Sequence, residues 1–273
     1  MEKRGLSKFG QISVFIILAI VLVSAGGIAY YMSKNTGTNN YFLQSDVKPG
    51  FDNIKNSVYE CMQSTSLDSL DLVGIQGGYY KEPKEFFDLG WAFIPYYYKQ
   101  GSFLMQTNSE IQNQLGLYVD DNLNSCLENI KVDDFSLTYT KPKTKTIISK
   151  EEVKFTIDMP VIVKKADKTT QLQLRDNSIS QKSQLYDMID IARYITDSHK
   201  EDPNMICISC VADMARERGL YVDMLDFGAD DSTTLVIVST NKTEMYPAVY
   251  EFLNKYNAKS GNLSPAPAPS ASA

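Results

Sequence analysis

The segment EVKFTIDMPVIVKK, residues 152–165, carries the clearest structural signal in the chain. Apolar side chains recur at every second position from Val153 to Val163, and most residues between them are polar, such as Lys154 and Asp158. Successive side chains of a β-strand point to opposite faces, so a period of two is typical of a strand with one buried and one hydrated face. The segment therefore predicts a strand over 153–163.

Similar alternation on both sides of this segment predicts the rest of a sheet. Phe135, Leu137 and Tyr139 precede it, and Leu172 and Leu174 follow it, which favours neighbouring strands in an antiparallel meander. Further strands are expected near the end of the chain, at 221–227, 234–239 and 248–256.

Helical spacing of apolar residues appears in the segments between these strands. The predicted helices cover 51–73, closed by the glycines at 74, 77 and 78, then 109–130 and 185–195. A fourth helix is expected to begin at Asp202-Pro203, because aspartate is a good N-cap and proline fits the first helical position. Together these elements predict an α+β fold, with helices packed on a mainly antiparallel sheet.

An aromatic-rich segment, WAFIPYYY at residues 91–98, lies between the first two predicted helices. Followed by a turn at 99–101, it predicts an extended, hairpin-like element. Aromatic rings are more often buried, which favours this segment as part of the core. The alternative is an exposed platform that binds glycans or a partner protein.

The N-terminal part of the chain predicts a membrane anchor. Residues 14–32 are apolar without a charge, and nineteen residues of helix extend about 28 Å, close to the thickness of the hydrocarbon core of a bilayer. Lys3, Arg4 and Lys8 precede this run, whereas only Lys34 follows closely, which places the N-terminus in the cytoplasm. We therefore expect a single-pass protein of the cell membrane that contacts lipid through residues 12–32, with its C-terminal domain extracytoplasmic.

The string Lys8-Phe9-Gly10-Gln11-Ile12-Ser13 resembles an archaeal class III, prepilin-like signal sequence. The resemblance implies cleavage between Gly10 and Gln11, with the apolar helix retained as an anchor or as a pilus core. Phe15 stands where such chains usually carry glutamate, and loss of this carboxylate argues against filament assembly. The alternatives are a plain signal anchor and removal by ordinary signal peptidase.

A second resemblance covers Gly74-Ile75-Gln76-Gly77-Gly78-Tyr79 and the two predicted helices that carry Cys61 and Cys126. These features resemble an uncharacterised group of archaeal membrane-anchored extracellular proteins, which carries no established activity.

Five regions follow from these patterns. They are a cytoplasmic basic region at 1–10, a transmembrane or pilin-like helix at 11–33, a helical membrane-proximal region with the aromatic segment at 34–130, an α+β extracytoplasmic domain at 131–257, and a flexible Pro/Ala/Ser tail at 258–273. The formal net charge of −6 and the absence of a basic patch argue against nucleic acid as a partner. Like subunits or envelope components are the expected protein partners.

Four cysteines in an exported domain predict disulfides, although four cysteines permit three connectivities. Cys61 and Cys126 each lie on the apolar stripe of a predicted helix, so packing of the two helices would bring them together. Cys207 and Cys210 form a Cys-x-x-Cys motif. In an exported domain, a structural disulfide or buried pair is favoured over redox exchange and metal binding for this motif. Because the predicted cap at Asp202 places Cys207 beyond the first helical turn, little activation of its thiol is expected.

No pattern indicates catalytic, cofactor-binding or metal-binding residues. The single histidine, His199, completes neither a zinc site nor a recognisable hydrolase triad, and Asp226, Asp230 and Asp231 are typical of a tight turn. We therefore expect a non-enzymatic anchored protein with a structural, adhesive or pilin-like accessory role. The alternatives are a tethered thiol-disulfide oxidoreductase that uses Cys207 and Cys210, and an extracellular ligand-binding domain that uses the aromatic segment.

Overall fold

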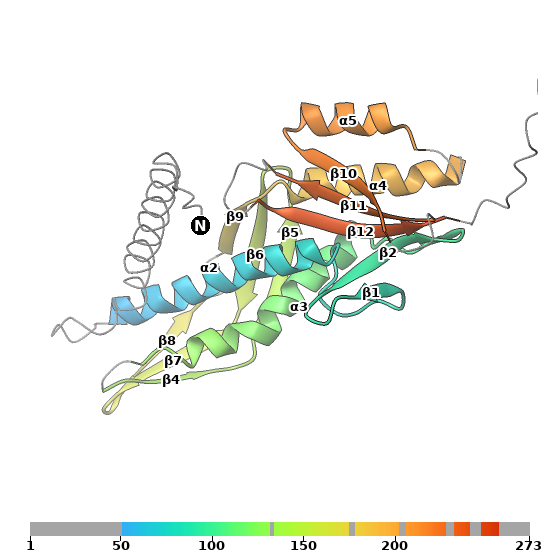
Figure 1. Ribbon diagram of the computed structural model, residues 1–273. Coiled ribbons are helices and arrows are strands. Elements are labelled where there is room, and N and C mark those ends of the chain that lie inside the picture. The colour runs from blue at the N-terminus through green and yellow to red at the C-terminus, as the bar shows by residue number, and fades with distance from the viewer. Residues whose placement is uncertain are drawn as a thin grey trace, which may run out of the picture. The chain divides into compact units, whose positions relative to one another are not determined.

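Four helices and three β-sheets make up the part of the chain that the computed structural model describes (Figure 1). This part comprises residues 51–131, 134–174, 178–201, 206–227, 232–240 and 247–256, and all of it falls within one compact unit, Gly50–Ala273. The fold is α+β and its strand pairs are mainly antiparallel, as the sequence predicts.

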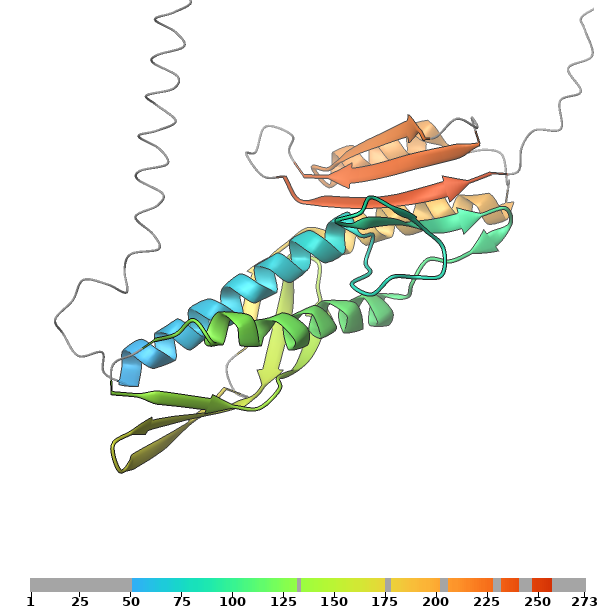
Figure 2. The same cartoon turned by 60° about the horizontal axis from the view of Figure 1, so that its bottom comes forward.

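Helices α2 (Phe51–Ile75) and α3 (Asn108–Leu127) lie side by side, as both Figure 1 and Figure 2 show. Their positions match the first two predicted helices. Each buries an apolar stripe, which in α3 consists of Ile111, Leu115, Val119, Leu123 and Leu127, whereas Cys126 and Ile130 of the predicted stripe are half-buried. Thr107 caps α3 through a capping box: its hydroxyl accepts from the Glu110 N–H, and the Glu110 carboxylate accepts from the Thr107 N–H.

The largest sheet joins strands from both ends of the described chain. Its order is β1 (Phe86–Asp88), β2 (Phe93–Lys99), β12 (Val249–Lys255), β11 (Thr233–Ser239) and β10 (Tyr221–Asp226), with the short β3 (Ser102–Phe103) paired to β2. The pairing of β2 with β12 is parallel and the other pairs are antiparallel. Residues on either side of the predicted boundary at 130/131 therefore share one sheet.

The segment 152–165 forms two strands rather than the single predicted one, so this prediction was wrong. Strand β6 (Glu152–Asp158) lies between β5 (Lys143–Ile148) and β9 (Ser178–Lys182), whereas β7 (Pro160–Lys165) lies between β4 (Ser136–Tyr139) and β8 (Lys168–Gln173). Proline lacks the N–H that a continuing ladder requires and is accepted at the first position of a strand. Pro160 opens β7, and the buried Met159 keeps the alternation unbroken across the change of sheet.

Helices α4 (Leu185–Glu201) and α5 (Ile208–Glu217) pack on the largest sheet, α4 against β11 and β12 and α5 against β10 (Figure 1). Helix α4 confirms the predicted helix at 185–195. The predicted helix start at Asp202-Pro203 was wrong, because α5 begins at Ile208 with Cys207 as its N-cap. A proline disfavours helical geometry in the residue before it, so the Asp202-Pro203 pattern fits a helix stop as well as a helix start. Asp202 and Pro203 lie outside the described part.

One face of the largest sheet is buried beneath the helices. Val236 and Val238 of β11 pair with Phe252 and Tyr250 of β12, and directly paired residues share a face. All four are fully buried, and Tyr97 of β2 stacks on Phe252 with ring centroids 4.4 Å apart. The main core therefore lies between this face and the helices that cover it.

The end of α2 approaches the same sheet very closely. A Cβ placed on Gly77 would lie 2.4 Å from the Glu251 carbonyl oxygen and 2.7 Å from Cγ of Pro95, and the φ angle of Gly77 is +51°. Only glycine satisfies both the positive φ and the lack of space. The glycines that were predicted to end the first helix thus also dock it against the backbone of β12.

The predicted anchor at 11–33, the processing site at Gly10 and Gln11, and the tail at 258–273 lie outside the described residues. Within the described segments, no helix combines the length and apolar character that are needed to cross a bilayer.

Candidate functional site

The four cysteines form two disulfides, and the first of them staples the core. Cys61 of α2 is bonded to Cys126 of α3 with Cα atoms 5.6 Å apart, which confirms the pairing that the apolar stripes indicated. Cys61 is only 5% exposed, and Cys126 packs partly buried against the core. This bond closes 65 residues of chain and constrains the two long helices.

The second disulfide, Cys207–Cys210, lies at the surface where α5 begins, with Cα atoms 5.2 Å apart. Cys207 is exposed and Cys210 is half-buried. The Cys207 sulfur accepts a hydrogen bond from the Cys210 N–H at 3.3 Å, and the Ser209 hydroxyl lies 3.5 Å from the same sulfur. A reagent in solvent can therefore reach Cys207 first.

The position of Cys207 at the start of α5 has a chemical consequence. The N-terminus of a helix carries partial positive charge and unpaired N–H groups, both of which stabilise an anion. The first turn of α5 contains no acidic residue that would oppose this effect. Upon reduction, the helix end therefore favours a thiolate at Cys207. This corrects the expectation from the predicted cap at Asp202, which placed Cys207 too far along the helix.

An apolar groove of about 580 Å³ lies between α5 and β10, beside this disulfide. Its walls are Val211 and Ala215 of α5 together with Val222 and Met224 of β10, and Ile208 stands at its rim. Ile208 is 71% exposed and lies between the two cysteines in the chain. The lining of the groove therefore includes the residue that follows Cys207 in the chain, although neither cysteine lines it.

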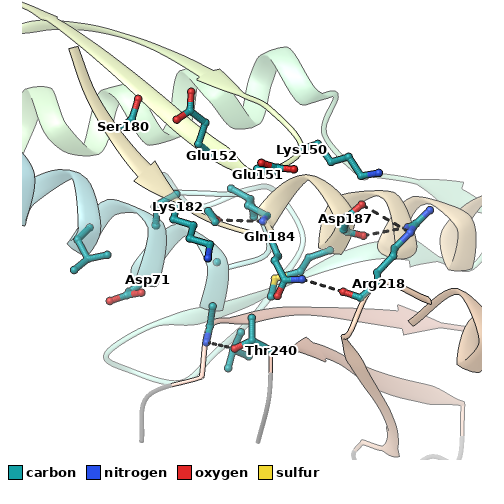
Figure 3. Close-up of a pocket in the computed structure, with 18 of the residues that line it drawn as sticks. Asp71, Lys150, Glu151, Glu152, Ser180, Lys182, Gln184, Asp187, Arg218 and Thr240 are labelled. Atoms are coloured by element: carbon teal, nitrogen blue, oxygen red, sulfur yellow. Dashed lines mark hydrogen bonds and ion pairs between the residues drawn. The ribbon is translucent and has the colours of Figure 1, made fainter. Parts of the chain in front are cut away.

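A larger groove of about 1250 Å³ is polar (Figure 3). Charges of both signs surround it: Lys150, Lys182 and Arg218 on one hand, and Asp71, Glu151, Glu152, Asp187 and Glu217 on the other. The Arg218 guanidinium forms ion pairs with Asp190 at 2.7 Å and Asp187 at 3.8 Å, and Gln184 donates to the Arg218 carbonyl. Burial, and then the neighbouring Asp68, raise the pKa of Asp71. These interactions tie the end of α5 to α4, and they do not assemble a nucleophile with a base.

The aromatic segment belongs mainly to the core, as favoured from the sequence. Phe93, Tyr97 and Tyr98 are buried, and the Tyr97 and Tyr250 hydroxyls lie 2.5 Å apart. Burial raises the pKa of both phenols, so the pair stays neutral. Trp91 differs, since it is 72% exposed in the turn between β1 and β2.

The other predicted residues do not gather into a site. Among the described residues, no three side chains of the His, Cys, Asp and Glu types come close enough to hold a metal ion. His199 lies in the last turn of α4 and Asp226 ends β10, whereas Asp230 and Asp231 lie outside the described part.

Two features were not predicted from the sequence, the cap role of Cys207 and the groove near it. The apolar spacing of Ile208, Val211 and Ala215 was an available signal for one wall of that groove. Comparison of the chain with protein-family models, curated proteins and solved structures gives no match.

Proposed function

We propose that this chain is a single-pass anchored protein whose folded domain serves a structural, adhesive or pilin-like accessory role outside the cytoplasm. The observation that carries the proposal is the buried Cys61–Cys126 disulfide, because disulfides persist in oxidising compartments and are rare in the cytosol. The apolar run at 14–32 and the basic residues before it supply the anchor and its orientation.

Protease treatment of intact cells, compared with lysed cells, tests this topology. The expected result is digestion of the domain in intact cells, together with an oxidised Cys61–Cys126 bond in the native protein by peptide mass spectrometry. Protection of the domain in intact cells would overturn the proposal. The same spectra read the N-terminus, and a start at Gln11 would identify prepilin-type processing.

A second candidate function, thiol-disulfide exchange, is favoured by the cap position and exposure of Cys207. A substrate thiolate attacks the Cys207 sulfur, a mixed disulfide forms, and the electron pair of the broken bond leaves on Cys210 as a thiolate. A second substrate thiol, after losing its proton, attacks the substrate sulfur of the mixed disulfide, and Cys207 leaves as a thiolate. A leaving thiolate departs faster when it is stabilised, which the N-terminus of α5 provides. Another disulfide compound reoxidises the pair.

A variant pair tests this candidate in the full chain. Cys207→Ser should abolish exchange with a dithiol substrate, whereas Ser209→Ala, which keeps both cysteines, should retain most of it. If Cys207→Ser exchanged as fast as the unaltered protein, the candidate would fail.

A further inference from the structure

The apolar groove between α5 and β10 has the properties of a binding site. Its volume of about 580 Å³ lies within the range of about 300–1,000 Å³ that is usual for ligand sites. Of its lining residues, Val211, Ala215 and Leu220 are almost fully buried, so this part of the lining is firmly packed. The small side chains of Ala212 and Ala215 leave room for an occupant.

The groove is also nearly without charge. Among its lining residues only Arg216 is charged, and its guanidinium is paired with Asp213 at 2.8 Å. An occupant that gains from entering such a site must bring apolar side chains, because burial of a charged group without a partner is costly. The groove of Figure 3, in contrast, is lined by many charged side chains of both signs.

The disulfide identifies the kind of occupant. Ile208 lines the groove and adjoins Cys207 in the chain, so a molecule seated in the groove contacts the residue next to this cysteine. A molecule that both fills an apolar groove and presents a thiol to Cys207 is a polypeptide segment with a cysteine among apolar residues. Such segments are exposed in chains that have not finished folding.

We propose that this groove binds apolar, cysteine-containing segments of incompletely folded polypeptides and presents their thiol to Cys207. This inference rests on the exchange activity proposed above, and it names the substrate of that activity. Binding in the groove raises the effective concentration of the substrate thiol at the Cys207 sulfur. The bond changes are those already given: the substrate–Cys207 bond forms as the Cys207–Cys210 bond breaks, and the electron pair goes to Cys210.

Three thiol probes test the proposal on the full chain. They are free cysteine, a heptapeptide of leucine, valine and alanine with a central cysteine, and a matched heptapeptide of serine and glutamate with a central cysteine. Opening of Cys207–Cys210 is followed by mass spectrometry after rapid alkylation. The apolar peptide should react about tenfold faster than the polar one, a preference that corresponds to about 1.4 kcal/mol.

Two groove variants and one control separate binding from chemistry. Ala212→Glu and Ile208→Ser should remove the preference for the apolar peptide over the polar one, each rate being divided by the rate of the same variant with free cysteine. Ala212 is exposed, so glutamate there does not disturb the core. Leu67→Glu adds the same charge at an exposed apolar position of α2 outside the groove and should keep the preference.

The outcomes are distinguishable. Equal rates for the two peptides, or a preference that survives Ala212→Glu, would overturn the groove as the substrate site while leaving exchange intact. If free cysteine failed to open Cys207–Cys210, the exchange activity itself would fail. In that case binding of a serine analogue of the apolar peptide, measured by fluorescence anisotropy with and without Ala212→Glu, decides whether the groove still binds polypeptide. Absence of binding would overturn the inference as well.

Discussion

The two disulfides of this protein show how the same bond serves different ends in different surroundings. Cys61–Cys126 lies between two long helices, within the core and across 65 residues of chain. Cys207–Cys210 spans three residues at an exposed helix start. The first removes much conformational freedom from the unfolded chain, whereas the second removes little and is open to attack. The geometry thus predicts that the first bond mainly stabilises the fold and that the second is the one more readily reduced.

The largest expected effect is on stability. Replacing Cys61 and Cys126 together by alanine should lower the free energy of unfolding by about 4 kcal/mol, because closure of a 65-residue loop is lost. Replacing Cys207 and Cys210 together by alanine should cost under about 2 kcal/mol, since their loop is short. Urea unfolding of both variants measures the difference. Equal losses would contradict the assignment of stability to the first bond.

The next expected effect is on the rate of reduction. Sub-stoichiometric dithiothreitol should open Cys207–Cys210 on the order of a hundredfold faster than Cys61–Cys126, because the buried bond must wait for local opening of the helices. Differential alkylation followed by peptide mass spectrometry reads both bonds in one sample. In urea above the unfolding midpoint the two rates should converge. A persistent hundredfold gap there would mean that burial is not its cause.

Two glycines with positive φ, one at the end of α2 and one after α5, differ in the space around them. Gly77 and Gly219 both have positive φ, at +51° and +67°, but a Cβ at Gly219 meets nothing within 4 Å. Gly219→Ala should therefore cost about 1 kcal/mol from φ alone. Gly77→Ala should cost about 3 kcal/mol, because its Cβ also meets the Glu251 carbonyl oxygen and Pro95. Thermal unfolding distinguishes them, and similar losses would show that the close approach is easily relieved.

The smallest expected effect concerns the two helix caps. Thr107→Ala removes the capping box of α3 and should cost about 1 kcal/mol of unfolding free energy. Cys207→Ala in the reduced protein should cost less, because sulfur is a weaker acceptor than a hydroxyl oxygen. Urea unfolding of each variant, compared with the reduced parent protein, measures the two losses. A larger loss at Cys207 would reverse their order.

The α3 cap also predicts a dependence on pH. The Thr107 N–H and hydroxyl lower the pKa of Glu110 below its usual value of 4.5. A carboxyl whose pKa is lower in the folded than in the unfolded state stabilises the fold at pH values above its unfolded-state pKa. This stabilisation is lost as the pH falls through the folded-state pKa. The stability of Glu110→Gln, which has no carboxyl to titrate, should therefore change less than that of the parent protein between pH 5 and pH 3. A stability change equal to that of the parent protein would exclude this role for Glu110.

Most elements of the fold could be predicted from local patterns. Helices α2, α3 and α4, and the final three strands β10, β11 and β12, fall close to their predicted ranges. In each, the apolar period reports which side chains are buried, and burial selects the element that places them on one face. The Cys61–Cys126 pair followed from the same stripes. The apolar spacing of Ile208, Val211 and Ala215 is a comparable signal for the α5 side of the groove.

The failures arose where one local signal fits two structures. The alternation from Val153 to Val163 fits one strand or two. The apolar residues remain at every second position across the break, so Pro160 is the one sign of it in the sequence. Asp202-Pro203 fits a helix start or a helix stop, since proline restricts its neighbours in both settings. Choosing correctly requires knowing which elements pack beside the segment.

The sequence by itself determined the α+β class, most helix and strand positions and the cysteines that could meet on packed helices. Only the tertiary structure decided the division of strands among three sheets, the parallel pairing of β2 with β12 and the groove beside Cys207. The physical reason is that periodicity depends on residues a few positions apart. Strand partners and grooves depend instead on contacts between residues far apart in the chain, such as Tyr96 and Leu253, and no local pattern encodes them.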